Sequence, residues 1–170
     1  TFDDAYANLV TLALPVLKEL QIPATVFVPV DHVGGCNQWD VVNGAEKINI
    51  MTWEELRKLA EEKLSKGENS KADERLITIG AHGCSHTSMG QCNEVQTNFE
   101  ITHAKEVLEK ELGVAVKYFA YPYGQLKDLN LFSEKALQDA GYEAALTTLW
   151  GKNRSPVKRK KEQNRFRLQR

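Results

Sequence analysis

The sequence predicts one α/β domain with a mainly parallel sheet, for two reasons. First, four short runs are rich in β-branched and aromatic residues, and these are Ala24–Val30, Leu76–Gly80, Val116–Ala120 and Ala144–Thr148. Second, segments with helical periodicity lie between them, and strands that alternate with helices of about 10–15 residues are typical of βαβ units. A chain of 170 residues, 42% of them hydrophobic, can bury one substantial core, so we expect a single domain over residues 1–170.

Helical periodicity and capping residues delimit the helices. Apolar residues repeat with a helical period along Tyr6–Leu20, where Pro15 must kink the helix or lie in its first turn because it lacks a backbone N–H. A first strand, truncated where the sequence starts, precedes this helix. Three further helices are indicated by a capping box at Thr52–Glu55, a stop at Gly113 after Phe99–Leu112, and a cap at Ser133 with a stop at Gly141.

Charge and hydropathy exclude several classes of protein. The formal net charge of −1 gives no reason to expect a nucleic-acid partner. No apolar run reaches the roughly 18–20 residues of a membrane span. The polar stretch Ser65–Arg75 and the basic stretch 151–170 are expected to be exposed surface segments, and the second is also compatible with a tail that binds polyanions.

The three cysteines, Cys36, Cys84 and Cys92, are odd in number and lack CxxC spacing. This pattern argues against a disulfide framework and against a zinc site made of four thiolates. It mildly favours a reducing compartment such as the cytoplasm. The sequence starts at Thr1 without an initiator Met, so a lost leader or anchor leaves the compartment open.

Polar residues gather where strands of the predicted sheet end. Asp3 and Asp4 follow the truncated first strand, His82 follows the second of the four runs, and Tyr121–Gly124 follows the third. The functional sites of parallel α/β folds lie at the carboxyl ends of their strands. We therefore expect these three clusters to converge.

The adjacent carboxylates of Asp3 and Asp4 repel each other unless a cation lies beside them. A bound dication removes that cost, because one carboxylate ligates the ion while its neighbour accepts a proton from water. The structural alternative is that the pair caps and opens the helix that contains Leu9, since carboxylates stabilise helix N-termini.

His82 and His86 are separated by four residues, so on a helical turn both imidazoles would project from one face toward one zinc-like ion. Two histidines and one carboxylate, Asp4, leave coordination positions open, as a catalytic ion requires. Zinc is the first expectation, with cobalt, nickel or iron as options. One alternative is that the spacing of the two histidines arises by chance. A less favoured alternative is that Cys84 replaces Asp4 as a ligand, because its side chain should point away from the face that the two histidines share.

An ordered set of motifs resembles the polysaccharide deacetylases that share the NodB homology domain, carbohydrate esterase family 4. The motifs are Thr1–Asp4, Pro15–Leu17, Ala24–Phe27, Ile79–His86 and Phe119–Gly124. The resemblance extends from residue 1 to about residue 148. It implies a distorted, incomplete (β/α) barrel. It also implies hydrolysis of an N-acetyl or O-acetyl group on an amino-sugar polymer or oligomer, with release of acetate.

The family resemblance also implies roles for individual residues. Asp3 would be the general base, and Asp4 would join His82 and His86 as a metal ligand. The segment of Pro122 and Tyr123 would form one wall of the substrate site, and the Tyr123 backbone N–H would donate to the oxyanion of the tetrahedral intermediate. Two exposed-loop aromatics, Trp39 and Trp150, suit stacking on a sugar ring, with packing as the alternative.

One departure from the family pattern concerns the base. Ala120 occupies the position of an arginine that usually orients the catalytic aspartate. We expect an arginine from elsewhere to replace it, and Arg170 and Arg167 are the candidates because the run Arg165–Leu168 looks like a last strand returning to the barrel. Without such a replacement Asp3 would be poorly held.

Two further departures concern hydrogen bonds and protons. Gly83 stands where a Ser or Thr usually follows the first histidine, so Ser85 is expected to supply that hydrogen bond if it is made. The late Leu-His pair that supplies the family's general acid is absent from the sequence. His103 is expected on a helix surface and His32 in a loop, which leaves the acid to water or to residues beyond Arg170.

These departures keep two alternatives open. One is hydrolysis of a non-sugar amide or a cyclic imide on the same scaffold, because Ala120 lies where the substrate is shaped. The other is a carbohydrate-binding domain that retained the metal ligands and lost turnover, because both the arginine and the acid depart from the pattern.

Overall fold

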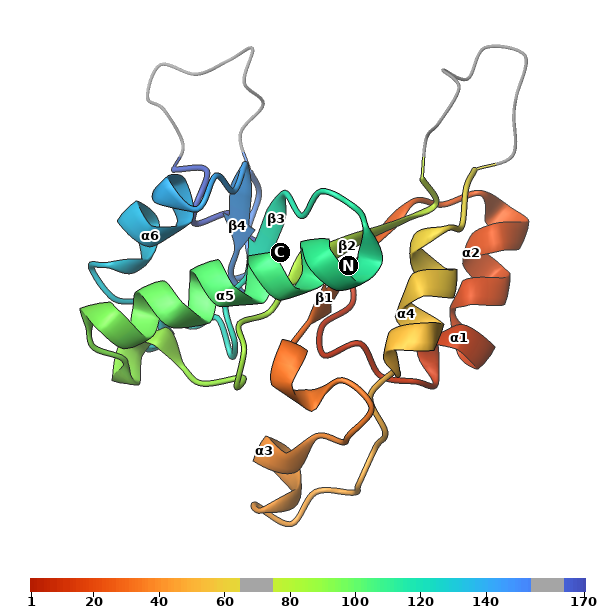
Figure 1. Ribbon diagram of the computed structural model, residues 1–170, viewed down its shortest axis with the longest axis horizontal. Helices are drawn as coiled ribbons and strands as arrows, with labels where there is room; N and C mark the ends of the chain where they lie inside the picture. Colours follow the sequence, from red (N-terminus) through yellow and green to blue (C-terminus); the bar gives the residue numbers. More distant parts are fainter. Residues whose placement is uncertain (65–74, 154–163) are drawn as a thin grey trace.

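A parallel sheet of four strands forms the centre of the protein (Figure 1). The computed structural model describes residues 1–64, 75–153 and 164–170. The strands lie in the order β1-β2-β3-β4, so each is hydrogen-bonded to the next along the chain. They are β1 (Ala24–Val28), β2 (Ile77–Ala81), β3 (Tyr118–Ala120) and β4 (Ala144–Leu146). All four predicted strands are confirmed; β1, β3 and β4 are shorter than their apolar runs, and β2 has the predicted length but starts one residue later.

Helices connect the strands and cover the sheet, as the βαβ pattern predicts. The α-helices are α1 (Leu9–Leu12), α2 (Leu14–Leu20), α3 (Gln38–Val41), α4 (Trp53–Ala60), α5 (Glu94–Leu112) and α6 (Ser133–Asp139). Three short 3₁₀ helices are η1 (Val30–His32), η2 (Met89–Gln91) and η3 (Leu126–Asp128). The long helix α5 crosses the sheet (Figure 1) and buries Ile101, Ala104 and Leu108, which recur at helical spacing.

The predicted helix Tyr6–Leu20 is divided into two. Helix α1 ends at Leu12, Ala13 lies between the helices, and Pro15 lies in the first turn of α2, where its missing N–H costs no helical hydrogen bond. The capping box at Thr52 is confirmed, since its side chain accepts from the backbone N–H of Glu55.

Two helix starts differ from the prediction. Helix α5 begins at Glu94, one residue after Asn93, whose side chain accepts from the backbone N–H of Gln96. Ser133 is the first residue of α6 and not its cap. The carboxamide oxygen of Asn130 accepts from the Ser133 backbone N–H at 3.0 Å and from its hydroxyl at 2.8 Å. A side chain three residues upstream therefore performs the capping.

Segments at the two ends of the described chain extend the sheet on both edges. Phe2 forms a parallel bridge with Val26 of β1, and Leu168 forms one with Leu146 of β4. These bridges correspond to the truncated first strand and the returning last strand that the sequence predicts. The sheet is open within the described residues, as expected of an incomplete (β/α) barrel.

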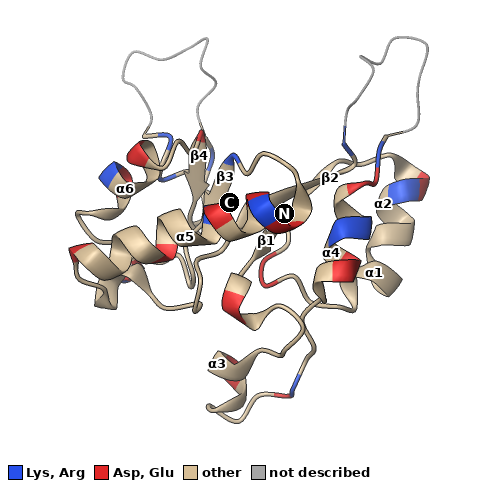
Figure 2. Cartoon of the chain, in the orientation of Figure 1, with Lys and Arg blue, Asp and Glu red and all other residues tan. Residues whose placement is uncertain are grey.

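The surface of the protein bears on the predictions about charge, membrane spans and exposed segments. Acidic and basic residues are interspersed on the outer helices (Figure 2), and on α4 Lys58 pairs with Glu54 at 2.7 Å. Among the described residues, no helix has the length and apolar character needed to cross a bilayer. Residues 65–74 and 154–163, which are nearly all of the first predicted surface segment and half of the second, lie outside the described residues.

Candidate metal centre and active site

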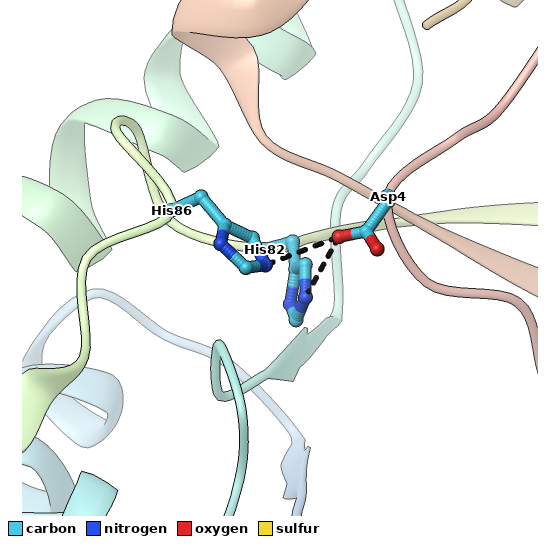
Figure 3. Close-up of side chains that lie close together, drawn as sticks. All are labelled: Asp4, His82 and His86. Atoms are coloured by element: carbon cyan, nitrogen blue, oxygen red, sulfur yellow. Dashed lines mark ion pairs between the residues drawn. The ribbon is translucent and has the colours of Figure 1, made fainter. Parts of the chain in front are cut away.

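Three side chains from distant parts of the sequence meet at one point (Figure 3). Asp4 Oδ1 lies 3.1 Å from His86 Nε2 and 3.4 Å from His82 Nε2. One ligand-type atom from each residue lies within 4.8 Å of the other two. Asp4 follows the segment beside β1, and both histidines belong to the loop after β2. The carboxyl ends of neighbouring strands thus bring together the three residues that the sequence singles out.

The two imidazoles converge through a loop and not through the expected helical turn. Residues 82–88 have no helical assignment, and the backbone takes positive φ values of 76° at Gly83 and 59° at His86. His82 Nδ1 donates to the backbone carbonyl of Ala120 at 2.8 Å, so Nε2 is the ring nitrogen that faces Asp4. The four-residue spacing of the histidines therefore predicts correctly that both rings converge, but a loop and not a helical turn brings them together.

The Asp3-Asp4 pair does not cap a helix. Helix α1 starts after Asn8, and Asp4 and Ala5 instead form a turn with φ values of 66° and 54°. Such conformations are costly for residues other than glycine and concentrate at functional sites. The capping alternative is wrong, because the turn directs the Asp4 carboxylate toward the histidines.

The donor set fits a divalent cation. Asp4 Oδ1 is buried and accepts no hydrogen bond from the described residues, although two imidazole nitrogens face it. Burial acts to raise the pKa of Asp4, but the adjacent His82 and His86 rings outweigh it and hold the pKa well below its ordinary range. Burial lowers the pKa of His86, which favours the neutral imidazole that a metal requires.

The alternative ligand Cys84 is wrong on geometry. Its buried Sγ points toward α5, 3.8 Å from the carbonyl oxygen of Phe99 and 3.7 Å from that of Glu100. Burial, together with the nearby carboxylates of Glu100 and Asp31, raises the pKa of the thiol to about 12. A protonated thiol directed away from the cluster cannot replace Asp4.

Comparison with known proteins decides the family. Residues 1–145 match the polysaccharide deacetylase family. The chain belongs to this family. A poly-beta-1,6-N-acetyl-D-glucosamine N-deacetylase of Staphylococcus epidermidis is 25% identical over 146 residues, which are 86% of this chain and 46% of that protein. The polysaccharide deacetylase chain described here therefore spans less than half the length of that relative.

Two solved structures share the fold of this polysaccharide deacetylase chain. IcaB from Ammonifex degensii has a TM-score of 0.67 at 23% identity, over 88% of this chain and 58% of that chain. The BpsB deacetylase domain from Bordetella bronchiseptica has a TM-score of 0.72 at 18% identity, over 99% of this chain and 68% of that chain. At these identities the likeness establishes the fold, which confirms the predicted α/β architecture of the NodB type.

This chain has Ala120 where the family resemblance places an arginine, and Arg170 contacts Asp3 instead. Its Nη1 donates to Asp3 Oδ1 at 2.6 Å. Its Nε donates to the backbone carbonyl of Thr147 at 2.9 Å, which fixes the side chain to the segment after β4. Arg167, the other candidate, pairs instead with Glu134 at 2.5 Å. Arg170 is therefore the arginine that contacts Asp3.

The segment after β3 presents Tyr123 beside the cluster. Its ring lies 5.0 Å from that of His86, its backbone φ is 62°, and its N–H has no acceptor among the described residues. Gly124 is needed next, because a Cβ there would lie 2.6 Å from the backbone nitrogen of Thr148. Pro122 is buried, and Gly83 lies beside it.

The two tryptophans differ in their surroundings. Trp39 stacks on His86 with ring centroids 3.8 Å apart, and it also lines a cavity of about 640 Å³ that reaches Tyr123. Asp4 and His82 are not among the residues that line this cavity. Trp150 is 96% exposed and does not line the cavity. Trp39 therefore both packs against His86 and forms part of the cavity wall.

The remaining histidines have structural contacts. His32 Nε2 donates to the backbone carbonyl of Ser85 at 3.2 Å, so this ring braces the histidine loop. His103 lies on α5, where it stacks on Phe99 and lies 3.7 Å from Glu106.

Sequence-based reasoning missed Glu100. It lies on α5, and its carboxylate is buried against the histidine loop. The Ser85 hydroxyl, which the sequence predicts to support a metal ligand, bonds to Glu100 and Thr87 and to none of Asp4, His82 and His86. A signal was available, since Glu100 falls between the core positions Thr97 and Ile101 on the buried face of the helix.

Proposed function

We propose that residues 1–170 form a catalytic domain that hydrolyses N-acetyl groups on a carbohydrate polymer and releases acetate. The observation that carries this proposal is the meeting of the Asp4 carboxylate with the His82 and His86 imidazoles at the carboxyl ends of the strands. Membership of the polysaccharide deacetylase family supports it. The named activity of the Staphylococcus epidermidis relative makes a polymer of N-acetylglucosamine the substrate to test first.

Asp4, His82 and His86 would hold one divalent ion, and two imidazoles with one carboxylate suit zinc. When bound, such an ion acts as a Lewis acid that polarises an acyl carbonyl and makes water more acidic. Cobalt, nickel and iron are compatible with the same donors. The surroundings of His86 and Asp4 favour a neutral imidazole and an ionised carboxylate, which are the forms that bind a metal.

Asp3 is the general base in this proposal. It accepts a proton from the water whose oxygen attacks the acyl carbon. Arg170 fixes the orientation of the Asp3 carboxylate, because it donates to Oδ1 while its own Nε donates to the Thr147 carbonyl. The carbon–nitrogen bond then breaks, and the departing amine takes its proton from water.

The backbone N–H of Tyr123 donates to the acyl oxygen as negative charge develops on it. Its position beside His86 and its lack of an acceptor among the described residues support this role. A preorganised donor of this kind is typically worth ~3–4 kcal/mol of transition-state stabilisation. The cavity beside His86, with Trp39 as one wall, gives the adjoining sugar residues a place to bind.

The decisive experiment measures acetate released from N-acetylglucosamine oligomers by the metal-loaded protein, with and without a chelator. We expect release that the chelator abolishes and that added zinc restores. Absent or chelator-insensitive release contradicts the proposal. Parallel assays with an O-acetylated sugar, a non-sugar amide and a cyclic imide identify the alternative hydrolases. Oligomer binding without turnover under any metal would indicate a carbohydrate-binding domain.

A further inference from the structure

Glu100 connects the long helix α5 to the loop that carries both histidines. Its Oε2 accepts from the backbone N–H of Cys84 at 2.6 Å and from that of Ser85 at 3.0 Å. Its Oε1 accepts from the Ser85 hydroxyl at 2.6 Å. The residue is only 7% exposed. One buried carboxylate thus accepts three hydrogen bonds from a stretch of two residues between His82 and His86.

The burial of Glu100 makes these hydrogen bonds important. Among the described residues, no Lys, Arg or His forms an ion pair with this carboxylate. A buried carboxylate is costly unless hydrogen-bond donors replace the water that it loses. Hydrogen bonds to an ionised acceptor are also stronger than those between neutral groups. The loop and Glu100 therefore stabilise each other.

Gly83 is the counterpart of this arrangement. Its φ is 76°, and a Cβ at this position would lie 3.0 Å from Glu100 Oε2. A serine or threonine, which the family pattern has at this position, would therefore be strained and would press on the carboxylate. The glycine at position 83 therefore leaves room for the Glu100 carboxylate against the loop.

The opposite side of the loop is held by its carbonyl groups. The backbone N–H groups of Val30 and Asp31 donate to the carbonyls of Gly83 and Cys84 at 3.3 and 3.1 Å. The His32 ring donates to the next carbonyl, that of Ser85. Helix η1 thus binds the carbonyls, and Glu100 binds the N–H groups. Because few other contacts satisfy these N–H groups, removal of Glu100 leaves one side of the loop unsupported.

We propose that Glu100 is a positioning residue that sets the histidine loop so that both imidazoles face Asp4, in place of the hydroxyl that the family carries at position 83. Glu100 does not touch the ion or the substrate and acts through the backbone at Cys84 and Ser85. This inference rests on the metal site of the proposed function. Its readout is metal binding, which requires no turnover.

The test compares metal binding by Glu100→Ala with that by the wild-type protein. We expect Glu100→Ala to bind zinc about 10- to 100-fold more weakly, and its cobalt form to have a changed absorption spectrum, because the nitrogen ligands are no longer held. Glu106→Ala, an exposed substitution on the same helix, is the matched control and should bind like wild type. Glu100→Gln should stay within about threefold of wild type, because its amide oxygen can accept from both backbone N–H groups.

Circular dichroism and thermal unfolding establish that each variant is folded. A folded Glu100→Ala with wild-type zinc affinity and cobalt spectrum overturns the inference. If Glu100→Ala does not fold, Ser85→Ala removes the hydroxyl hydrogen bonds to Glu100 and Thr87, and Thr87→Ala controls for the second; equal zinc affinity in the two variants overturns the inference. Zinc binding that depends on Glu100 in a protein that releases no acetate would refute the proposed function alone. Normal binding and turnover in Glu100→Ala would refute only this inference.

Discussion

Arg170 and Asp3 form an ion pair of 2.6 Å although 167 positions of sequence separate them. The pair joins the segment beside β4 to the segment beside β1, which are the two edges of the sheet. Arg170 is also held by the Thr147 carbonyl, so its guanidinium is fixed before any substrate binds. An arginine from the opposite edge thus contacts Asp3 in a chain that has alanine at position 120.

Arg170→Lys should lower kcat about 10- to 100-fold with little change in KM, because a lysine cannot hold both the Thr147 carbonyl and the Asp3 carboxylate in the same geometry. Steady-state kinetics on N-acetylglucosamine oligomers measure this effect. Arg167→Lys is the matched control, since Arg167 pairs with Glu134 and not with Asp3. Equal kinetics for the two variants would contradict the role of Arg170.

Asp3→Asn and Asp4→Asn should separate the two carboxylates. Asp3→Asn should reduce kcat by roughly 10²–10⁴-fold and leave zinc bound, because it removes a base but no ligand. Asp4→Asn should lose tight zinc binding, because a charged ligand is removed from a buried site. Zinc content after dialysis and single-turnover acetate release measure the two effects. Loss of zinc from Asp3→Asn, with retention by Asp4→Asn, would reverse the assignment.

Removal of the metal should destabilise the folded protein as well as abolish turnover. An ion at 100 times its dissociation constant stabilises the native state by about 2.7 kcal/mol, which corresponds to roughly 5–10 °C in a domain of this size. Thermal unfolding of apo and zinc-loaded protein measures the shift. The variant His86→Gln should show no such shift, and a shift of wild-type size in that variant would place the ion elsewhere.

The stability of the apo protein should fall as the solution is acidified. Burial lowers the pKa of His86 below the ordinary value of about 6.5, so the unfolded chain binds the proton more readily than the folded one. The contribution of the neutral His86 ring to the unfolding free energy is complete above the pKa of the unfolded state. It is lost as pH falls through the pKa of the folded state. Asp4, whose pKa is also lowered, acts in the same direction at lower pH.

Urea unfolding of the apo protein between pH 8 and about pH 5 tests this expectation. The decline in unfolding free energy should be smaller in His86→Gln, which lacks the titrating ring. Stability that rises on acidification over this range would contradict the linkage. The metal-loaded protein is not the subject of this test, since metal and protons compete for the same imidazole.

Substitution of the two tryptophans should give different results. Trp39→Ala removes a ring stacked on His86 and should destabilise the protein by about 1–3 kcal/mol while raising KM for oligomers. Trp150→Ala should change stability by less than about 0.5 kcal/mol, because the side chain is 96% exposed. Urea unfolding and KM on oligomers measure both. If Trp150→Ala raises KM alone, Trp150 is a sugar platform outside the cavity.

The sequence predicts the strands and the converging clusters because both depend on local signals. Each strand is a buried run of apolar residues, and the residues after it are at the carboxyl edge by construction. The break at Pro15 follows from its missing N–H in the same way. Such features require no knowledge of distant contacts.

Other features of the site depend on tertiary contacts that no local pattern encodes. The histidines converge through positive φ at Gly83 and His86, whereas their spacing alone suggests a helical turn. Glu100 resembles any acid in an amphipathic helix until the loop is packed against it. Serine is a residue type that often caps helices, but at the start of α6 the side chain of Asn130 accepts the hydrogen bond and Ser133 donates it. Tertiary packing decides each of these cases.

The edge-to-edge contact between Arg170 and Asp3 has a consequence for folding. Contacts between residues so distant in sequence carry a large loop-closure entropy and form late in folding. The helices and the pairing of β1 with β2 involve shorter separations and can precede it. During refolding, far-ultraviolet ellipticity should therefore recover before acetate release does, with a lag set by docking of the last segment against the first.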